Sequence, residues 1–285
     1  MFSESAHIEE TIAAFALHLA WLGYSESSQR MLPGCLREFL TVMALNPEEI
    51  READILTYRA YLQARPNRRR GGGLSEQMIH HHLYALRLWL SWQLEQGIID
   101  QHPMSGLRFP SPRSQAPQIL SLEEIQALYG VCYQPKERVV LSLCYGCGLR
   151  RSEAEALDLV DVQLSSGLLY VRSGKGGKRR VVPMSEGVMR DITAWLPARR
   201  TSAEPALLLN KQGRRMQGAS MYRILKNLLH RSGITKAVGL HSLRHSIATH
   251  LLERGMAIET LRDFLGHAHL ESTQIYARIQ SDNQS

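Results

Sequence analysis

A stretch without periodicity divides the chain. Residues 101–118 read QHPMSGLRFPSPRSQAPQ, with four prolines and no regular spacing of apolar residues. Proline lacks a backbone N–H and fixes one backbone dihedral, so this stretch can neither continue a helix nor join a central sheet strand. We therefore predict an extended linker at 101–118 between one domain at 1–100 and another at 119–285. The 285 residues are enough for two ordinary domains.

The first domain is predicted to be helical throughout. Its apolar residues recur at helical spacing, bounded by capping and stop signals, with no strand pattern among them. The predicted segments are 7–22, a helix from Ser25 or Ser27 to Met43, one from Pro47 through 51–64, and 75–97. Residues 65–73 (RPNRRRGGG) form a basic, glycine-rich loop, suited to touching a DNA backbone or to serving as a flexible connector.

The second domain mixes helices with a small sheet. Ser121 opens a capping box before a helix to Gly130, and 137–146 is apolar enough to be a buried helix. Over 159–183 the pattern changes to short β-rich runs broken by Ser-Ser-Gly and Gly-Lys-Gly-Gly, which predicts a three-stranded antiparallel sheet. Further predictions are helices at 185–196 and 219–232 and a short hairpin at 207–216. The chain is thus predicted to be mostly α, with a four-helix N-terminal domain and a mixed α+β C-terminal domain.

Two patterns resemble metal sites but do not fit one. Consecutive residues on a helix point about 100° apart, so His80, His81 and His82 cannot converge on one ion and are read as polar-face residues. Cys144 and Cys147 form a single CxxC with no second pair to complete four ligands, so packing is the better account. We predict no metal site and no cofactor, and four reduced thiols.

Positive charge is concentrated in the second domain. Residues 1–100 carry a net charge of −3, although the chain as a whole carries +7. Residues 171–236 hold fifteen Lys or Arg against three acidic residues, a net charge of +12. Such a run is either a solvated basic face or a phosphate-binding surface.

The end of the second domain has the groups that phosphodiester chemistry uses. His241 and Arg244 are three apart and share a helix face, while Leu243, Ile247 and Leu251 recur on another. An Arg fork matches phosphate oxygens, and His exchanges protons near neutral pH. Downstream follow a second imidazole and a phenol that can act as a covalent nucleophile, at His267 and Tyr276.

These residues resemble the motifs of the tyrosine recombinases, the Xer-type recombinases and phage integrases. The HxxRH at 241–245, the LGH at 265–267 and Tyr276, nine positions beyond His267, match the last motifs of that family. Arg150, in GLRRSE, resembles its first arginine, and Lys175, between two glycines, its hairpin lysine. About half of the chain is covered, in the family's order.

The resemblance implies a site-specific DNA recombinase with a catalytic second domain and a DNA-binding first domain that close on a duplex. Tyr276 would form a 3′-phosphotyrosyl link, Arg150 and Arg244 would clamp the phosphate, and Glu153 would support Arg150. His241 would assist proton removal, His267 would bind the phosphate, and Lys175 would protonate the leaving oxygen.

The rest of the basic surface is expected to meet DNA. The helix 219–232 is the candidate for the major groove, and Lys178 is the second choice for the general acid. The residues predicted to bind DNA are Lys178, Arg179, Arg180, Arg214, Arg215, Arg223 and Lys226.

The expected partners are double-stranded DNA and further copies of the chain, as a tetramer on two sites, or a partner recombinase. We expect no membrane association, because no apolar run is long enough to span a bilayer, and a cytoplasmic location, because the N-terminus does not read as a secretory signal. Only nine residues follow Tyr276, which leaves the mode of contact between protomers open.

Three alternatives stay open at this point. A non-catalytic DNA-binding protein would explain the charge but not the ordered motifs, and a type IB topoisomerase would share the chemistry. A metal-dependent hydrolase could use His241 and His245, but no glutamate lies between them as in HExxH. The competing nucleophiles Tyr145, Tyr170 and Tyr222 fall where core or strand packing is expected.

Overall fold

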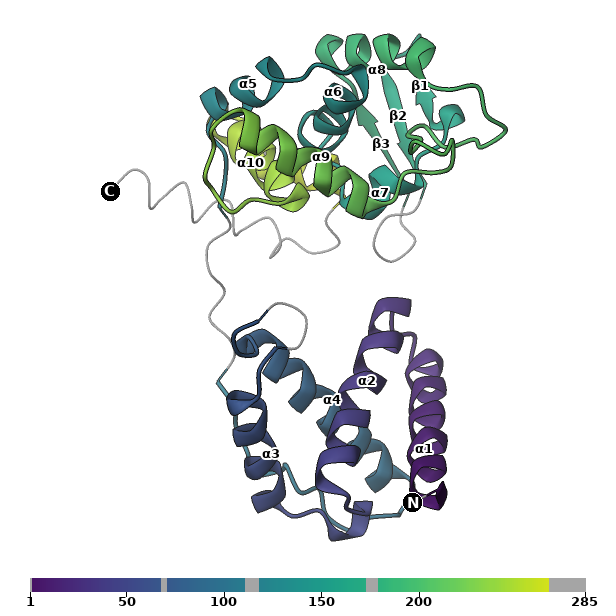
Figure 1. Ribbon diagram of the computed structural model, residues 1–285, viewed down its shortest axis with the longest axis vertical. Helices are drawn as coiled ribbons and strands as arrows, with labels where there is room; N and C mark the ends of the chain where they lie inside the picture. The colour runs from purple at the N-terminus through teal and green to yellow at the C-terminus, as the bar shows by residue number, and fades with distance from the viewer. Residues whose placement is uncertain (1, 68–70, 111–117, 173–178, 267–285) are drawn as a thin grey trace. The chain divides into compact units, whose positions relative to one another are not determined.

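The computed structural model describes residues 2–67, 71–110, 118–172 and 179–266. The chain forms two compact units, residues 1–115 and 116–285. Helices dominate both, and the sheet lies in the second unit, as Figure 1 shows. The predicted fold class, mostly α with a small antiparallel sheet, is confirmed.

Four α-helices build the first unit. They are α1 (Phe2–Trp21), α2 (Glu26–Met43), α3 (Glu52–Ala64) and α4 (Glu76–Glu95). Ser25 and Ser75 accept the backbone N–H of the third helical residue and so cap α2 and α4. The predicted third helix is divided: a 3₁₀ turn, η1 (Pro47–Glu49), precedes buried Ile50, and α3 starts afresh where Asp54 accepts the N–H of Arg51 at 2.8 Å.

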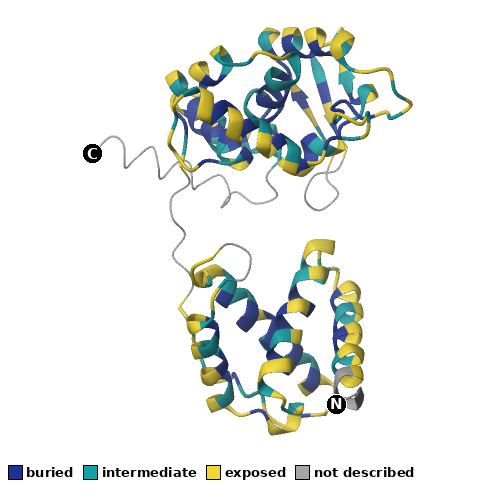
Figure 2. Ribbon diagram, viewed as in Figure 1, coloured by how far each residue is buried: buried dark blue, intermediate teal, exposed yellow. Residues whose placement is uncertain are grey.

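Aromatic and aliphatic side chains fill the interior of the first unit, which is dark blue in Figure 2. Phe15, Phe39 and Tyr58 are completely buried. The prediction that His82 lies on a polar face is wrong, because its side chain is 4% exposed and its Nδ1 lies 3.0 Å from the Tyr58 hydroxyl. The helix turns His82 inward because it falls between core residues Ile79 and Leu86 at spacings of three and four.

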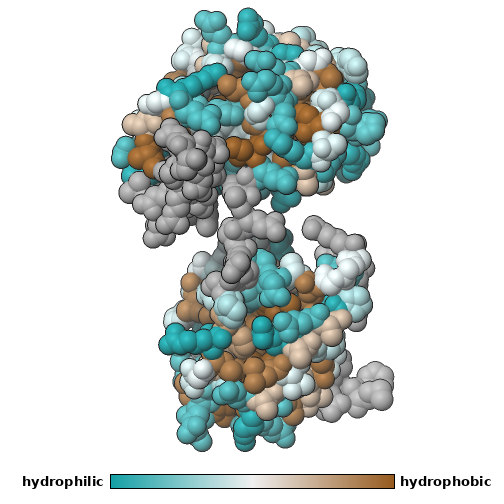
Figure 3. Space-filling view, turned by 90° about the vertical axis from the view of Figure 1, so that its left-hand side faces the viewer, coloured by the Kyte–Doolittle hydropathy of each residue, from teal (hydrophilic) through white to brown (hydrophobic). Residues whose placement is uncertain are grey.

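Apolar residues also remain at the surface of the first unit. The space-filling view shows them among hydrophilic ones (Figure 3). Among the side chains of this unit whose burial the structure describes, the most exposed large apolar ones are Trp21 and Leu17, at 83% and 73%. They lie four residues apart on α1 and therefore share a helix face. Single exposed apolar residues are ordinary, but two large ones on one face mark a candidate contact surface.

The second unit contains seven α-helices among its described residues. They are α5 (Leu122–Gly130), α6 (Pro135–Leu141), α7 (Arg151–Ala156), α8 (Glu186–Ala198), α9 (Gly218–Arg231), α10 (Leu240–Glu253) and α11 (Ile258–Leu265). Ser121 caps α5 in the predicted capping box. The predicted helix at 137–146 begins at Pro135 and ends in a π-helical turn, η2 (Ser142–Gly146). This turn packs against α6, α8 and α10, with Cys144 fully buried.

The predicted three-stranded sheet is present. Its strands β1 (Val162–Gln163), β2 (Leu168–Val171) and β3 (Arg180–Pro183) pair antiparallel in the order β1-β2-β3, after a short 3₁₀ helix, η3 (Leu159–Asp161). In the β2–β3 register Leu169 faces Val182 and Val171 faces Arg180. Figure 1 shows the strands beside α8, with α5 and α10 toward the other end of the unit.

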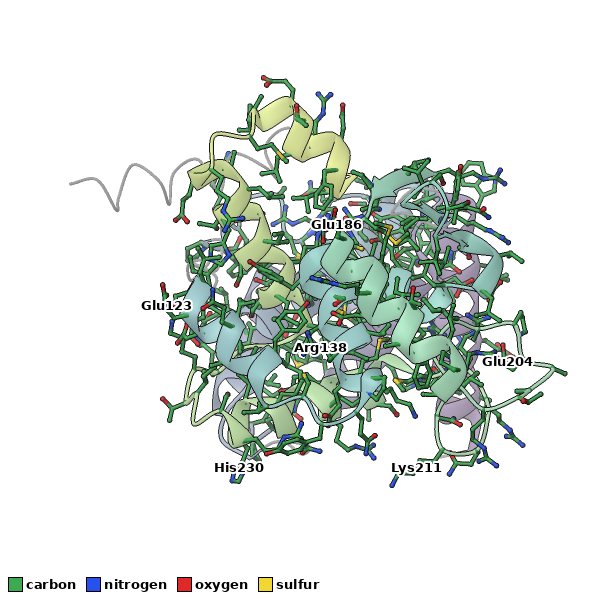
Figure 4. All side chains as sticks on the ribbon, turned by 90° about the horizontal axis from the view of Figure 1, so that it is seen from above. Glu123, Arg138, Glu186, Glu204, Lys211 and His230 are labelled. Atoms are coloured by element: carbon green, nitrogen blue, oxygen red, sulfur yellow. The ribbon has the colours of Figure 1, made fainter. Side chains whose placement is uncertain are left out.

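The short hairpin predicted at 207–216 is present as an antiparallel bridge between Leu209 and Arg215, flanked by backbone bonds from Asn210 N–H to the Arg214 carbonyl at 2.8 Å and from Met216 N–H to the Leu208 carbonyl at 2.9 Å. The Asn210 Oδ1 also accepts the N–H groups of Gln212 and Arg214 and so stabilises the turn. Charged side chains surround this unit, and Figure 4 shows Glu123, Lys211 and His230 projecting at its rim.

Candidate active site

The turn after η2 brings the start of α7 close to the end of α11. Gly148 adopts φ +58°, and a Cβ there would lie 2.9 Å from the Leu265 side chain and 3.1 Å from that of Phe264. Only glycine therefore allows both this turn and the approach of α11. Arg150 follows immediately and precedes the first residue of α7.

A buried carboxylate joins three arginines. The Glu153 side chain is fully buried, and its Oε1 accepts from Arg150 Nη1 at 2.6 Å and from Arg180 Nη1 at 2.8 Å. Its Oε2 accepts from Arg180 Nη2 at 2.8 Å and from the Arg150 backbone N–H at 2.8 Å. Arg244 Nη1 lies 3.7 Å from Oε2. The predicted support of Arg150 by Glu153 is thus present as an ion pair, within a larger cluster.

The electrostatics of this cluster favour anions. Burial alone would raise the pKa of the Glu153 carboxyl, but the hydrogen bonds and charges of Arg180 and Arg150 lower that pKa to about 2. Glu153 is therefore ionised at neutral pH. Three guanidinium groups surround one carboxylate, which leaves the cluster with a net charge of +2.

The same three arginines bind the end of α11. Arg180 Nε donates to the carbonyl of Phe264 at 3.1 Å, Arg244 Nη2 to that of Leu265 at 2.7 Å, and Arg150 Nη2 to that of Gly266 at 3.0 Å. The last carbonyls of a helix lack intrahelical partners and carry partial negative charge, so cations stabilise them. Gly266 then ends the helix with φ +65°.

His241 and Arg244 come from the first turns of α10. Arg244 is 3% exposed and also donates from Nη1 to the carbonyl of Gly148 at 2.6 Å. His241 keeps contact with solvent. Partial burial, followed by the charges of Arg244, Arg151 and Arg150, lowers the pKa of His241 below its ordinary value. His241 is therefore neutral at pH 7 and able to accept a proton.

Four predicted site residues lie outside the described residues: Lys175, Lys178, His267 and Tyr276. The described chain on either side of them is well anchored. Arg172, before the hairpin tip, forms an ion pair with buried Asp161, and Arg180, after it, is held by Glu153. Gly266, which precedes His267, is held by Arg150.

The residues predicted to bind DNA fall into two groups. Arg179, Arg214, Arg223 and Lys226 are exposed. Lys226 lies over the ring of Tyr222, also on α9, at 5.5 Å. These four side chains are accessible to a polyanion.

Arg180 and Arg215 differ, because their guanidinium donors are used inside the protein. Arg215 Nη2 lies 2.6 Å from Asp158 Oδ1, and its Nη1 donates to the carbonyls of Glu155 and Leu157. The Arg180 side chain is 9% exposed and bonded at all three of its nitrogens. In this structure the guanidinium groups at these two predicted DNA-contact positions are engaged within the protein.

The place of Arg180 in the cluster was not predicted from the sequence. The signal was the period of two in β3, where Val182 is buried and Arg180 lies on the same face. The run KRR drew attention to charge instead. Of the two arginines in this run, the alternation leaves Arg179 exposed and turns Arg180 toward the interior.

The competing tyrosines have ordinary surroundings. The Tyr145 hydroxyl lies 2.9 Å from His250 Nδ1, and burial raises the pKa of Tyr145. Tyr170 lies in β2, as expected of a strand residue, with 41% exposure. The expectation of packing is wrong for Tyr222, which is 42% exposed on α9.

Within 2–67, 71–110, 118–172 and 179–266, no group of three or more His, Cys, Asp or Glu side chains is placed to hold a metal ion. All four cysteines are free, and burial raises the pKa of the Cys144 and Cys147 thiols to about 12. Among the helices of the described chain, none has the length and apolar character needed to cross a bilayer.

Comparison with known proteins gives a consistent result. A model of the phage integrase family matches residues 118–283. The chain is 32% identical over 279 residues to tyrosine recombinase XerC of Chromobacterium violaceum, covering 95% of this chain and 91% of XerC. It is 34% identical over 275 residues to tyrosine recombinase XerA of Pyrococcus furiosus, covering 95% and 90%.

The fold also matches a solved structure. The Tn1549 transposon integrase in complex with transposon right end DNA has a TM-score of 0.76 and 15% identity, covering 96% of this chain and 99% of that chain. At this identity the likeness concerns the fold.

Proposed function

This chain belongs to the phage integrase family and is a tyrosine recombinase, an enzyme of site-specific DNA recombination, and we propose which of its residues perform the chemistry. Tyr276 attacks a DNA phosphodiester. The Tyr276 Oη–phosphorus bond forms, the bond from phosphorus to the 5′-oxygen breaks, and a 3′-phosphotyrosyl link results. A 5′-hydroxyl of a partner strand then reverses the step, so the energy of the phosphodiester is retained.

Protons move in both directions during cleavage. The ordinary phenol pKa is near 10, so Tyr276 needs a base at neutral pH. His241 is neutral and exposed beside the arginines, and it takes this proton. Lys175 protonates the departing 5′-oxygen, with Lys178 as the second choice. His267 donates a hydrogen bond to the phosphate.

The observation that supports this proposal best is the arginine cluster on Glu153. Arg150, from the N-terminal cap of α7, and Arg244, from α10, are brought to one carboxylate by the fold itself. Arginines fixed in this way stabilise the charge that develops on the non-bridging oxygens without reorganising during the reaction. The side chain of Arg150 remains 19% exposed, which leaves it accessible to a phosphate.

Double-stranded DNA is the partner that the family and the fold support. We assign the duplex contacts to the exposed cations Arg179, Arg214, Arg223 and Lys226, together with Lys178. Arg223 and Lys226 are three apart on α9 and share a face, so α9 is the helix that we place in the major groove. The basic loop at 65–73 contributes backbone contacts from the first unit.

We also propose that the enzyme works as a tetramer on two DNA sites, in the cytoplasm. Support for assembly comes from Trp21 and Leu17, two large apolar side chains that are exposed on one face of α1 and that a partner would cover. A partner recombinase with the same surface would serve equally well.

The test of the chemistry is Tyr276→Phe on a suicide substrate, a duplex whose cleaved strand diffuses away and traps the covalent adduct. We expect no adduct with the variant and duplex affinity within about twofold of the wild type, because the substitution removes one hydroxyl and no charge. Adducts formed by Tyr276→Phe would mean that another residue is the nucleophile.

Two controls separate the remaining alternatives. Adduct formation that persists in EDTA excludes a metal-dependent hydrolase, and exchange of strands between two sites excludes a topoisomerase that only relaxes DNA. No contact described above favours either alternative.

A further inference from the structure

Arg180 occupies an unusual position between two catalytic segments. It is the first residue of β3 and follows Lys175 by five positions. Its guanidinium reaches 27 residues back to Glu153 and 84 residues forward to the carbonyl of Phe264. The side chain is 9% exposed, so these bonds are shielded from water.

Packing around Gly266 shows how closely Arg180 fits the end of α11. A Cβ at position 266 would lie 2.7 Å from Arg180 Cδ and 3.0 Å from its Nη1. Gly266 therefore has two reasons to be glycine, namely its φ of +65° and the Arg180 side chain beside it. His267 is the next residue in the chain.

Both oxygens of Glu153 accept from Arg180, so Arg180 fixes the orientation of that carboxylate. Oε1 is shared with Arg150 Nη1, and Oε2 is shared with the Arg150 backbone N–H. A carboxylate held in this way has little freedom to rotate. The Arg150 guanidinium, which donates to the same carboxylate, is therefore also restricted in its orientation. The bidentate fork of arginine makes this possible, and a lysine ammonium cannot reproduce it.

We propose that Arg180 is a positioning residue, which ties the base of the Lys175 hairpin to the α11 end that leads into His267 and which orients Arg150 through Glu153. This inference rests on the proposed function for the identity of the reacting groups. Every Arg180 nitrogen is bonded to Glu153 or to the carbonyl of Phe264, and the tests below distinguish this role from a direct phosphate contact.

The test uses Arg180→Lys, which keeps the charge but loses the fork. Its matched control is Arg190→Lys, an exposed arginine on α8. At saturating suicide substrate we expect adduct formation by Arg180→Lys to be at least about tenfold slower, because displacements of about 1 Å at a site cost up to about a hundredfold. Duplex affinity should stay within about twofold, and Arg190→Lys should match the wild type in both measurements.

A double variant tests whether Arg180 acts by positioning His267 or independently of it. In a His267→Ala background, the loss caused by Arg180→Lys should be smaller than in the wild-type background, because one of the groups being placed is gone and only the part that acts through Arg150 remains. Losses that multiply fully, or an affinity that falls tenfold while the saturated rate is unchanged, would overturn the proposal in favour of a direct phosphate contact. So would unchanged rates in Arg180→Lys.

Hydrogen exchange of the free protein provides a readout that does not depend on activity. In Arg180→Lys the backbone amides of α11 should exchange at least about tenfold faster, while those of α9 keep their wild-type rates, because only α11 loses a partner for its terminal carbonyl. Unchanged protection of α11 would also overturn the proposal.

Hydrogen exchange distinguishes a failure of the Arg180 proposal from a failure of the proposed function. If the wild type forms no adduct, the proposed function fails, and hydrogen exchange still decides the structural role of Arg180. If Arg180→Lys unfolds below the assay temperature, Arg180→Gln, which keeps a planar donor without the charge, is measured in its place with the same expected results.

Discussion

Each unit of the chain contains a glutamate that binds arginine close to other polar side chains. In the first unit Glu38 binds Arg65, and His82 Nε2 lies 3.9 Å from the same carboxylate. His82 is in turn paired with the hydroxyl of Tyr58. Burial lowers the pKa of His82, which is therefore neutral at pH 7. One arginine balances one glutamate, and this network has no net charge.

The second unit uses the same chemical groups in a different ratio. Glu153 forms ion pairs with Arg150, Arg180 and Arg244. The first network has one arginine for one glutamate, whereas this one has two positive charges in excess. Burial is also more complete, because Glu153 is fully buried and the Glu38 side chain is 26% exposed. The comparison teaches that a buried ion pair by itself indicates architecture, whereas an excess of fixed guanidinium groups indicates a site for an anion.

The largest expected effect comes from removing each carboxylate charge. Glu153→Gln leaves three guanidinium groups without a counter-charge, so we expect adduct formation on a suicide substrate to fall at least about a hundredfold and stability to fall by about 3 kcal/mol. Glu38→Gln is the matched variant, and at saturating DNA its adduct rate should equal that of the wild type. Equal losses of activity in both variants would remove the distinction between the two networks.

The pH dependence of stability sharpens the same comparison. The pKa of Glu153 is lowered from 4.5 to about 2, so its ionised form stabilises the folded state above pH 4.5, and this contribution is lost as the pH falls toward 2. The difference between these two pKa values corresponds to about 3 kcal/mol of folding free energy for this buried group. Denaturant unfolding at several pH values measures the free energy of unfolding of both proteins. The difference in this free energy between wild type and Glu153→Gln should decrease by about this amount between pH 5 and pH 2. A gap that stays constant over that range would show that the charge of Glu153 is not what stabilises the cluster.

Variants on the exposed apolar face of α1 should affect assembly without affecting the chemical step. Replacing Leu17 and Trp21 together by Ser should weaken the assembly of two DNA sites by about tenfold, because large apolar residues contribute strongly to protein contacts. The adduct rate on a single site should be unchanged. Leu56→Ser, at an apolar residue of α3 that is 44% exposed, is the control and should leave assembly intact. Sedimentation of the protein with DNA carrying one or two sites measures both states.

The smallest expected effect concerns His241. Arg151 is among the charges that lower the pKa of His241, after burial and Arg244. Arg151→Gln should therefore raise that pKa and move the acid limb of the adduct-formation profile to higher pH, with the plateau rate retained. Arg190→Gln, which removes a charge from exposed α8, should leave the profile in place. A shift toward lower pH with Arg151→Gln would contradict the role of His241 as the base.

Local rules account for what the sequence predicted well. Ser121 caps α5 in the predicted capping box, Ser25, one of the two predicted candidates, caps α2, and the Arg150–Glu153 pair follows from a spacing of three. The hairpin signals placed the three strands because turn chemistry is also local.

Contacts between distant residues explain what the sequence did not reveal. The bonds of Arg180 span 27 and 84 residues, and those of Arg215 to Asp158 span 57. His82 reaches Tyr58 across 24 residues and two helices. Charge and composition look the same for an arginine that faces solvent and one that is bonded to a buried carboxylate, so they do not distinguish Arg179 from Arg180, and the fold identifies the partner of Arg180 as Glu153.

The central claim is that the second unit delivers the phenol of Tyr276 to a DNA phosphorus. Digestion of the trapped covalent complex with protease and nuclease, followed by mass spectrometry, identifies the modified residue directly. We expect the nucleotide mass on Tyr276. A nucleotide on Tyr170 or Tyr222, both of which are exposed, would contradict the account.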